Sequence, residues 1–171
     1  YTCPKSNLLG RLRESYSFGM ACKNYIKTNK TDIDIIYMNS WPIFAQYITV
    51  KISSKYDIPI ITHVQDVYPE SLSTKIPVLG VLFNLIFKPL DKLVLGKSNK
   101  VITISENMKK YLAISRQISL GKIKVVQNWQ DEEKFIDYES IRKPIQKKLF
   151  TFMYMGNLGP VAGIELLIES F

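Results

Sequence analysis

The sequence has few of the residues that build disulfide frameworks and metal centres. Its 171 residues include two cysteines, Cys3 and Cys22, and one histidine, His63. Two cysteines are too few for a disulfide scaffold or a thiolate zinc site, and one histidine excludes a pair of imidazole ligands. A single histidine also means that a Ser-His-Asp or Cys-His catalytic arrangement would have no second base in reserve. We therefore expect inert thiols, a hydrogen-bonded structural histidine and no bound metal, in a reducing cytoplasm.

Long apolar runs are also missing. The longest uncharged candidate, residues 78–87, is followed at once by Lys88, Asp91 and Lys92, whereas a membrane-spanning helix needs about 20 apolar residues. No secretory signal opens the sequence, which begins with Tyr1. The helical spacing of apolar residues at positions 164–171 continues to the end without a stop signal. We therefore expect a fragment of a longer protein.

Glycine and proline are scarce, with eight of each, while 46% of the residues are hydrophobic and 22% are charged. This composition is typical of a globular domain and excludes disordered, collagen-like and low-complexity chains. Lysine and arginine outnumber aspartate and glutamate by 23 to 15, a formal net charge of +8. The excess favours an anionic partner, which can be a nucleic acid, a membrane surface or a phosphorylated ligand.

Short β-rich runs alternate with helical patterns along the chain. We expect strands at residues 33–38, 59–64, 101–104 and 123–127. Helices are predicted before residue 33, at residues 44–54 and 78–97, and after Ser105, which is a good N-cap. Nearly continuous apolar strands separated by helices indicate an α/β fold, with a Rossmann-like, doubly wound parallel sheet covered on both faces.

The composition changes after this first domain, which we place at residues 1–130. Residues 131–148 are highly charged, lack apolar periodicity and contain Pro144, so they have the signature of a linker. Residues 150–155 are expected to form another strand, followed by a glycine-bearing turn and a helix near Gly163. We therefore expect residues 149–171 to begin a second domain.

Polar residues follow each strand of the predicted sheet. Ligands of open parallel sheets bind outside the carboxyl ends of the strands, so these residues would line one cleft: Asn39 and Ser40, then Gln65, Asp66 and Glu70, then Ser105 and Glu106, and lastly Asn128. Two carboxylates in one strand-end loop, Asp66 and Glu70, can orient hydroxyl groups or act as a base. Turn and capping chemistry around Pro69 explains them equally well.

Two other patterns carry less information. Asp32 and Asp34 form a D-x-D that holds a metal-nucleotide in some sugar transferases, but they stand at the amino end of a strand, so we expect a solvated strand start. Residues 156–163 combine a glycine turn with a helix N-terminus, a geometry that receives phosphate groups. An ordinary tight turn between strand and helix is the alternative.

Four segments, taken in their order and spacing, resemble family 4 glycosyltransferases of bacterial surface-polysaccharide assembly, particularly the subgroup that builds capsule, O-antigen or colanic acid repeats. They are VQDVYPES (64–71), VITISENMKKYL (101–112), VVQNWQDEEKF (125–135) and MYMGNLGPVAGIELLIES (153–170). The resemblance implies a GT-B fold of two Rossmann-like domains, with the acceptor mostly on the first domain and a UDP- or GDP-sugar mostly on the second. It implies transfer with retention and without a cofactor or an obligatory metal.

Carried over residue by residue, the resemblance gives Gly156, Asn157, Gly159 and Gly163 to the donor diphosphate. Gln65 falls where many family members have a histidine that contacts the donor sugar. Together with the carboxylates of Asp66 and Glu70 in the same loop, which can give acid-base help, Gln65 is our candidate for the catalytic centre. The family's paired-glutamate motif would lie beyond Phe171, so we expect the 171-residue chain alone to transfer no sugar.

The expected partners are a nucleotide-sugar donor and a lipid-linked or glycan acceptor. Lysines beside the apolar stretch of residues 78–97 can also seat the domain on the inner face of an anionic cytoplasmic membrane. A nucleotide-sugar 2-epimerase of the same fold is the first alternative, and a non-catalytic basic binding module is the second. Nucleic acid is not expected, because the sequence shows no aromatic stacking motif or basic recognition helix.

Overall fold

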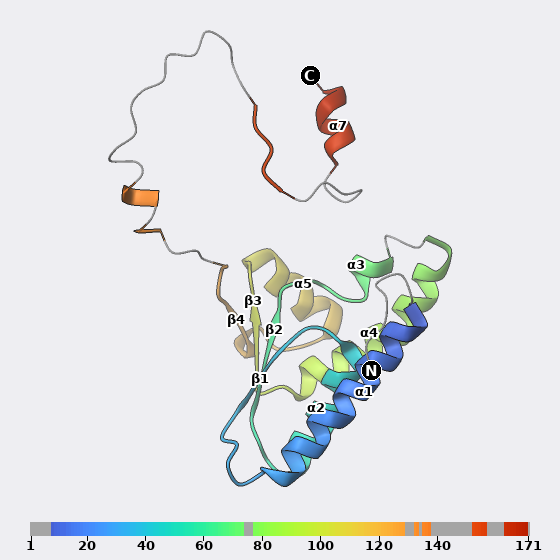
Figure 1. The fold of residues 1–171 in the computed structure, drawn as a ribbon, viewed down its shortest axis with the longest axis vertical. Coiled ribbons are helices and arrows are strands. Elements are labelled where there is room, and N and C mark those ends of the chain that lie inside the picture. The colour runs from blue at the N-terminus through green and yellow to red at the C-terminus, as the bar shows by residue number, and fades with distance from the viewer. Residues whose placement is uncertain are drawn as a thin grey trace. The chain divides into compact units, whose positions relative to one another are not determined.

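The computed structural model describes residues 8–73, 77–128, 132–133, 135–137, 152–156 and 163–170. The chain divides into two compact units, Tyr1–Trp129 and Gln130–Phe171. In the first unit, helices and strands alternate along the chain (Figure 1): α1 (Leu8–Thr28), β1 (Ile36–Asn39), α2 (Ile43–Lys55), β2 (Ile60–Val64), α3 (Glu70–Ser73), α4 (Pro77–Lys97), β3 (Lys100–Thr103), α5 (Glu106–Arg116), the short 3-10 helix η1 (Leu120–Lys122) and β4 (Ile123–Val125).

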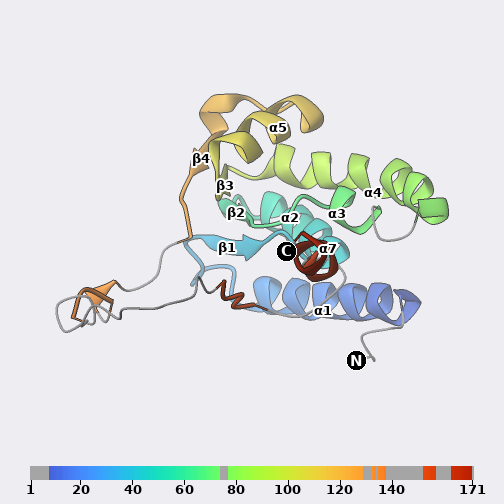
Figure 2. The ribbon, with the colours of Figure 1, turned by 90° about the horizontal axis from the view of Figure 1, so that it is seen from above.

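The strands form one sheet in the order β1-β2-β3-β4, and every neighbouring pair is parallel. Helices α2, α4 and α5 connect consecutive strands and lie on the same face of the sheet (Figure 2). Such one-step crossovers between parallel strands are right-handed, which puts them all on one side. The expected α/β class with a Rossmann-like parallel sheet is confirmed. In the described part of the chain these helices cover one face, so coverage of both faces stays a prediction.

The core lies between the sheet and this helix layer. One cluster contains Val64, Val101 and Ile123 from the strands together with Leu95 of α4 and Leu112 of α5. A second cluster packs Val50 of α2 and Val94 of α4 against Ile60 of β2. Strand residues between these positions, such as Tyr37 and Lys100, point to the other face and are exposed.

The limits of two strands differ from the predicted ones because pairing, and not apolar composition, decides where a strand begins and ends. β1 begins at Ile36 instead of residue 33, and its first backbone bond runs from the Ile36 amide to the carbonyl of Pro59, just before β2. β4 ends at Val125 instead of residue 127, because its partner β3 ends at Thr103.

The N-cap of α5 is confirmed, since the Ser105 hydroxyl accepts a hydrogen bond from the Met108 amide at 3.2 Å.

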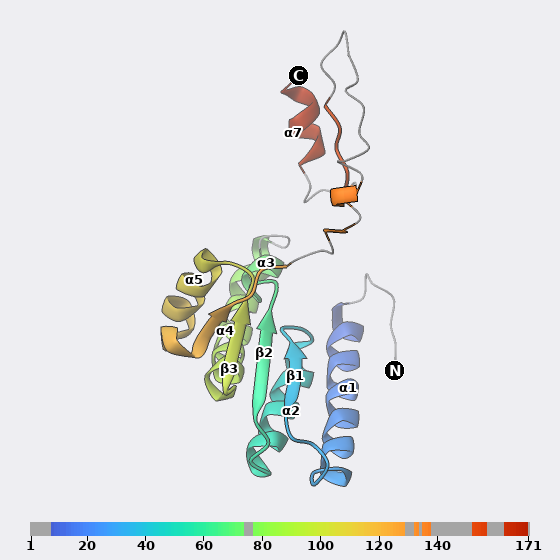
Figure 3. The ribbon, with the colours of Figure 1, turned by 90° about the vertical axis from the view of Figure 1, so that its left-hand side faces the viewer.

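The helix layer continues beyond α2 to α1, which lies past β1 in the view of Figure 3. None of the described helices has the length and apolar character needed to cross a bilayer.

The second unit is described at residues 152–156 and at α7 (Ile164–Glu169). The strand predicted at 150–155 is not formed over its described part, residues 152–155. A strand needs a partner for its backbone groups, and none pairs with these residues in the described part of the chain. The helix predicted near Gly163 is confirmed as α7. The proposed domain limits at residues 130 and 148 stay a prediction.

Candidate functional site

Because all four strands are parallel, the segments that follow them leave the same edge of the sheet. At the end of β1, Asn39 is exposed and its carbonyl accepts a hydrogen bond from the Gln46 side-chain amide of α2, while Ser40 is buried. After β2, Gln65 and Asp66 are exposed side by side. These four predicted residues therefore lie at the ends of two neighbouring strands.

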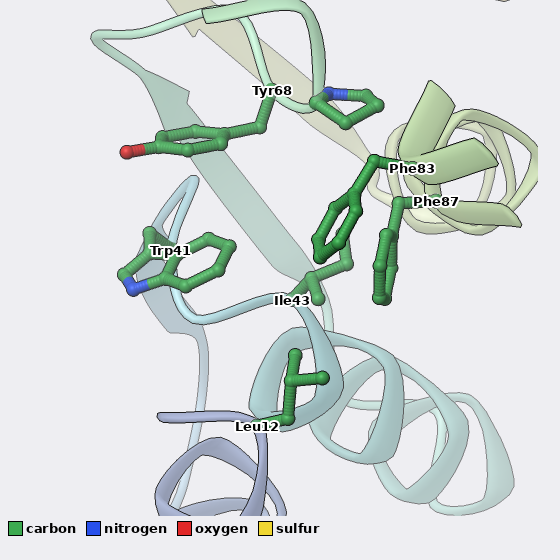
Figure 4. Close-up of a pocket in the computed structure, with 7 residues that line it drawn as sticks. Leu12, Trp41, Ile43, Tyr68, Phe83 and Phe87 are labelled. Carbon is green, nitrogen blue, oxygen red and sulfur yellow. The ribbon is translucent and has the colours of Figure 1, made fainter. Parts of the chain in front are cut away.

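Two aromatic residues cover this part of the edge. Trp41, just after β1, stacks on Tyr68 in the loop after β2, with ring centroids 4.8 Å apart and an interplanar angle of 28°. The stack borders an apolar pocket in which Phe83 and Phe87 of α4 face it from the other side (Figure 4). The residues that line the pocket come from five segments of the chain: Leu12, Trp41, Ile43, Tyr68, Pro69, Phe83 and Phe87.

Glu70, the third predicted catalytic residue, begins α3 and is held by charged and polar partners. Both of its carboxylate oxygens accept hydrogen bonds from the Arg116 guanidinium at 2.7 Å. Oε1 also accepts from the Tyr111 hydroxyl at 3.0 Å and lies 3.5 Å from the Lys88 ammonium. Burial opposes ionisation of Glu70, but the bonds from Arg116 and Tyr111 outweigh it and lower the pKa to about 2. Glu70 is therefore an ionised carboxylate that is already bound.

Arg116 is fully buried at the end of α5, and its contacts extend to a second carboxylate. Its Nε donates to Asp91 of α4 at 2.6 Å. Burial raises the pKa of Asp91 to about 6, although the bond to Arg116 acts in the opposite direction. Two carboxylates from different segments thus share one guanidinium inside the first unit.

Of the predicted residues after β3 and β4, one caps a helix and two are exposed. The Ser105 hydroxyl is used by the helix cap, and Glu106 is exposed with Lys109 at 3.8 Å. Asn128 is exposed after β4. His63 donates to or accepts from Tyr37 through Nδ1 at 2.6 Å, as expected of a structural histidine.

The glycine turn lies in the second unit. Gly156 is exposed, and Gly163 has φ +63° as the residue before α7, a left-handed conformation that favours glycine. Asn157 and Gly159 lie outside the described residues. The roles of all four in donor binding stay predictions.

Sequence reasoning missed Arg116, Asp91 and the Trp41–Tyr68 stack. A signal for the first two was present, because Arg116 follows Met108 and Leu112 at intervals of four on the core-facing side of α5. Asp91 similarly lies four residues after Phe87 on the buried side of α4. Opposite charges at core-facing positions of two helices indicate a buried ion pair. Trp41 and Tyr68 follow neighbouring predicted strands, so their segments were expected at one edge of the sheet, but nothing in the sequence indicates that the two rings stack.

The chain was compared with family models, curated proteins and solved structures. A family model described as Glycosyltransferase Family 4 matches residues 3–134. No curated protein and no solved structure matches the chain significantly. The matched range includes strands β1 to β4, the Trp41–Tyr68 stack and the ion pairs of Arg116 with Glu70 and Asp91.

Proposed function

We propose a function from the premise that the chain belongs to glycosyltransferase family 4. Its first unit binds the acceptor of a sugar transfer. The donor is a nucleotide-sugar, and the acceptor is a lipid-linked sugar or glycan used in cell-surface polysaccharide synthesis. The observation that carries the proposal is the strand edge at β1 and β2, where the Trp41–Tyr68 stack adjoins the polar groups of Asn39, Gln65 and Asp66.

The edge has the two surfaces that a sugar attached to a lipid requires. Aromatic rings pack against the apolar faces of a sugar, while amide and carboxylate groups bind its hydroxyls. Leu12, Phe83 and Phe87 place apolar side chains beside the stack, so the surface next to the proposed sugar site suits contact with the hydrocarbon part of a lipid.

Within this proposal, Asp66 accepts a hydrogen bond from the attacking hydroxyl and Gln65 contacts the donor sugar. Holding the hydroxyl next to the donor is the main contribution of this unit, since correct orientation removes much of the entropic barrier. Residues 149–171 begin the domain that binds the donor diphosphate, and charge stabilisation of the departing nucleotide comes from that side. The transfer retains configuration and needs no metal.

We also propose that α4 attaches the first unit to an anionic membrane. Val81, Leu82, Leu85 and Ile86 form an exposed apolar surface, and Val81 and Leu85 are 77% and 72% exposed. Phe83 and Phe87 on the same part of the helix line the pocket. Contact of α4 with a bilayer therefore brings a lipid-linked acceptor next to the aromatic stack, and the net charge of +8 favours anionic lipid.

Product analysis tests the proposal. The protein at its natural length is incubated with UDP- and GDP-sugars, first alone and then with a lipid-linked sugar. We expect a glycosylated lipid only in the second case, with the anomeric configuration of the donor retained by NMR, and no turnover by the 171-residue chain alone. Epimerised or hydrolysed donor formed without acceptor would instead establish the 2-epimerase alternative.

A further inference from the structure

We propose that Arg116 is the positioning residue of the acceptor site, an inference that rests on the proposed function. Arg116 lies at the end of α5 and does not belong to the strand-end loops that form the site. Its guanidinium nevertheless bonds to the backbone and side chain of the loop after β2. Arg116 is thus expected to set the shape of a site that it does not touch.

The bonding capacity of this guanidinium is fully used. A guanidinium has five N–H donors, and each has an acceptor here. Nε donates to Asp91, Nη1 donates to Glu70 and to the Ser115 hydroxyl, and Nη2 donates to Glu70 and to the Tyr68 carbonyl. The side chain is 0% exposed, so no donor is satisfied by solvent. Five bonds in fixed directions define one position for the loop relative to α4 and α5.

The bonds act on the part of the loop that matters for the acceptor. The Tyr68 carbonyl and Glu70 are held 2.5 and 2.7 Å from Nη2, and Gln65 and Asp66 lie in the same short connection between β2 and α3. The ring of Tyr68 stacks on Trp41, which follows β1 (Figure 4). Fixing Tyr68 therefore fixes both the polar side and the aromatic side of the proposed site.

Lysine cannot replace Arg116 in this arrangement. It has the same charge, but a single ammonium group cannot bind the two Glu70 oxygens, Asp91 and the Tyr68 carbonyl in a planar fork. Arg116→Lys is therefore expected to keep the charge inside the fold while releasing the loop. Lys110→Arg on the exposed side of the same helix is the matched control.

The first test measures amide hydrogen exchange of the chain without ligand. We expect Arg116→Lys to speed exchange at residues 65–71 and 41–43 at least tenfold, with the core amides of β2 and β3 and the Lys110→Arg variant unchanged. Unchanged exchange in both segments, or an equal increase throughout the first unit, would overturn the proposal. If Arg116→Lys does not fold, Glu70→Gln tests the same expectation, since it removes the charged acceptor at a position whose side chain is 23% exposed.

The second test measures kinetics of the protein at its natural length. Arg116→Lys is expected to raise the KM for the lipid-linked sugar at least tenfold and to lower kcat. The KM for the nucleotide-sugar should rise less, because only Gln65 of this loop contacts the donor in the proposed site. Equal changes in both KM values, or no change in either kcat or the KM for the lipid-linked sugar, would contradict a positioning role. If the wild type transfers no sugar, the proposed function fails, whereas the exchange measurement still decides whether Arg116 positions the loop.

Discussion

At the scale of single residues, the buried charges of the first unit give it a measurable pH dependence. Asp91 is 5% exposed and faces Arg116, with Glu70 on the other side of the guanidinium. Its pKa of about 6 exceeds the value of about 3.9 expected in the unfolded chain. The contribution of protonated Asp91 to the free energy of unfolding is therefore fully present below about pH 4 and is lost as the pH rises through 6.

Asp91→Asn should remove this dependence. The wild type should lose roughly 2 kcal/mol of its free energy of unfolding between pH 4 and pH 7 through Asp91, because one pKa unit corresponds to about 1.4 kcal/mol. The variant should not show this loss. Urea unfolding at several pH values measures the difference. Asp34→Asn, at an exposed position, is the control, and an identical pH profile for both variants would contradict the assignment.

Trp41 gives a residue-scale prediction for binding. Removing its ring by Trp41→Ala eliminates the stack with Tyr68, and aromatic pairs are worth about 0.5–1.5 kcal/mol beyond the area they bury. We expect the KM for the lipid-linked sugar to increase about tenfold, with that for the nucleotide-sugar little changed. Tyr25→Ala, which removes an exposed ring from α1, should leave both values unchanged. An equal increase in the two variants would count against a specific role of the stack.

At this scale the sequence located the strand-end residues but not their partners. Asn39, Gln65 and Asp66 were found because each follows an apolar strand, and parallel strands end at one edge. Arg116 binds Glu70 across 46 positions of the sequence and Asp91 across 25. Spacing along α4 and α5 indicates that Asp91 and Arg116 face the core, but which groups they meet there depends on how the helices pack on the sheet.

At the scale of elements, the contact between α1 and α2 depends on a small residue. A Cβ added at Gly19 would lie 2.8 Å from the Ala45 Cα and 2.8 Å from the Ile48 side chain. A Cβ at Gly96 of α4 would meet no atom within 4 Å. The two glycines therefore make a matched pair for testing how closely the helices pack.

Gly19→Ala should lower the free energy of unfolding by about 1–3 kcal/mol, because the Ala45 backbone cannot move aside without shifting α2. Gly96→Ala should raise it by up to about 1 kcal/mol, because alanine favours the helix. Thermal and urea unfolding measure both changes. Equal effects of the two substitutions would show that α1 and α2 are not packed as described.

The elements themselves were largely predictable. Apolar periodicity gave the existence and order of β1 to β4 and of α2, α4 and α5, and the Ser105 cap was correct. The strand ends were less predictable, since they depend on where the partner strand stops. The strand predicted at 150–155 was wrong over its described part for the same reason: a β-rich run does not provide its own partner.

At the scale of the whole molecule, the apolar surface of α4 predicts attachment to lipid. Leu85→Glu places a charge in the middle of this surface, and burial of one leucine contributes about 1.5–3 kcal/mol. In vesicle flotation with anionic lipid, we expect the variant to bind at least tenfold less than the wild type. Ile114→Glu, at a position of α5 that is 80% exposed, should bind like the wild type. Wild-type protein that stays with the soluble fraction would contradict membrane attachment.

The most direct test of the account is a hydrogen-exchange footprint of the acceptor. The probe is a sugar linked through diphosphate to a short lipid in detergent micelles, with the same micelles alone as the reference. We predict slower exchange at residues 39–46 and 65–73, which contain the strand ends, Trp41 and Tyr68. Slower exchange confined to other segments, such as 118–126, or no change at all would contradict an acceptor site at this edge of the sheet.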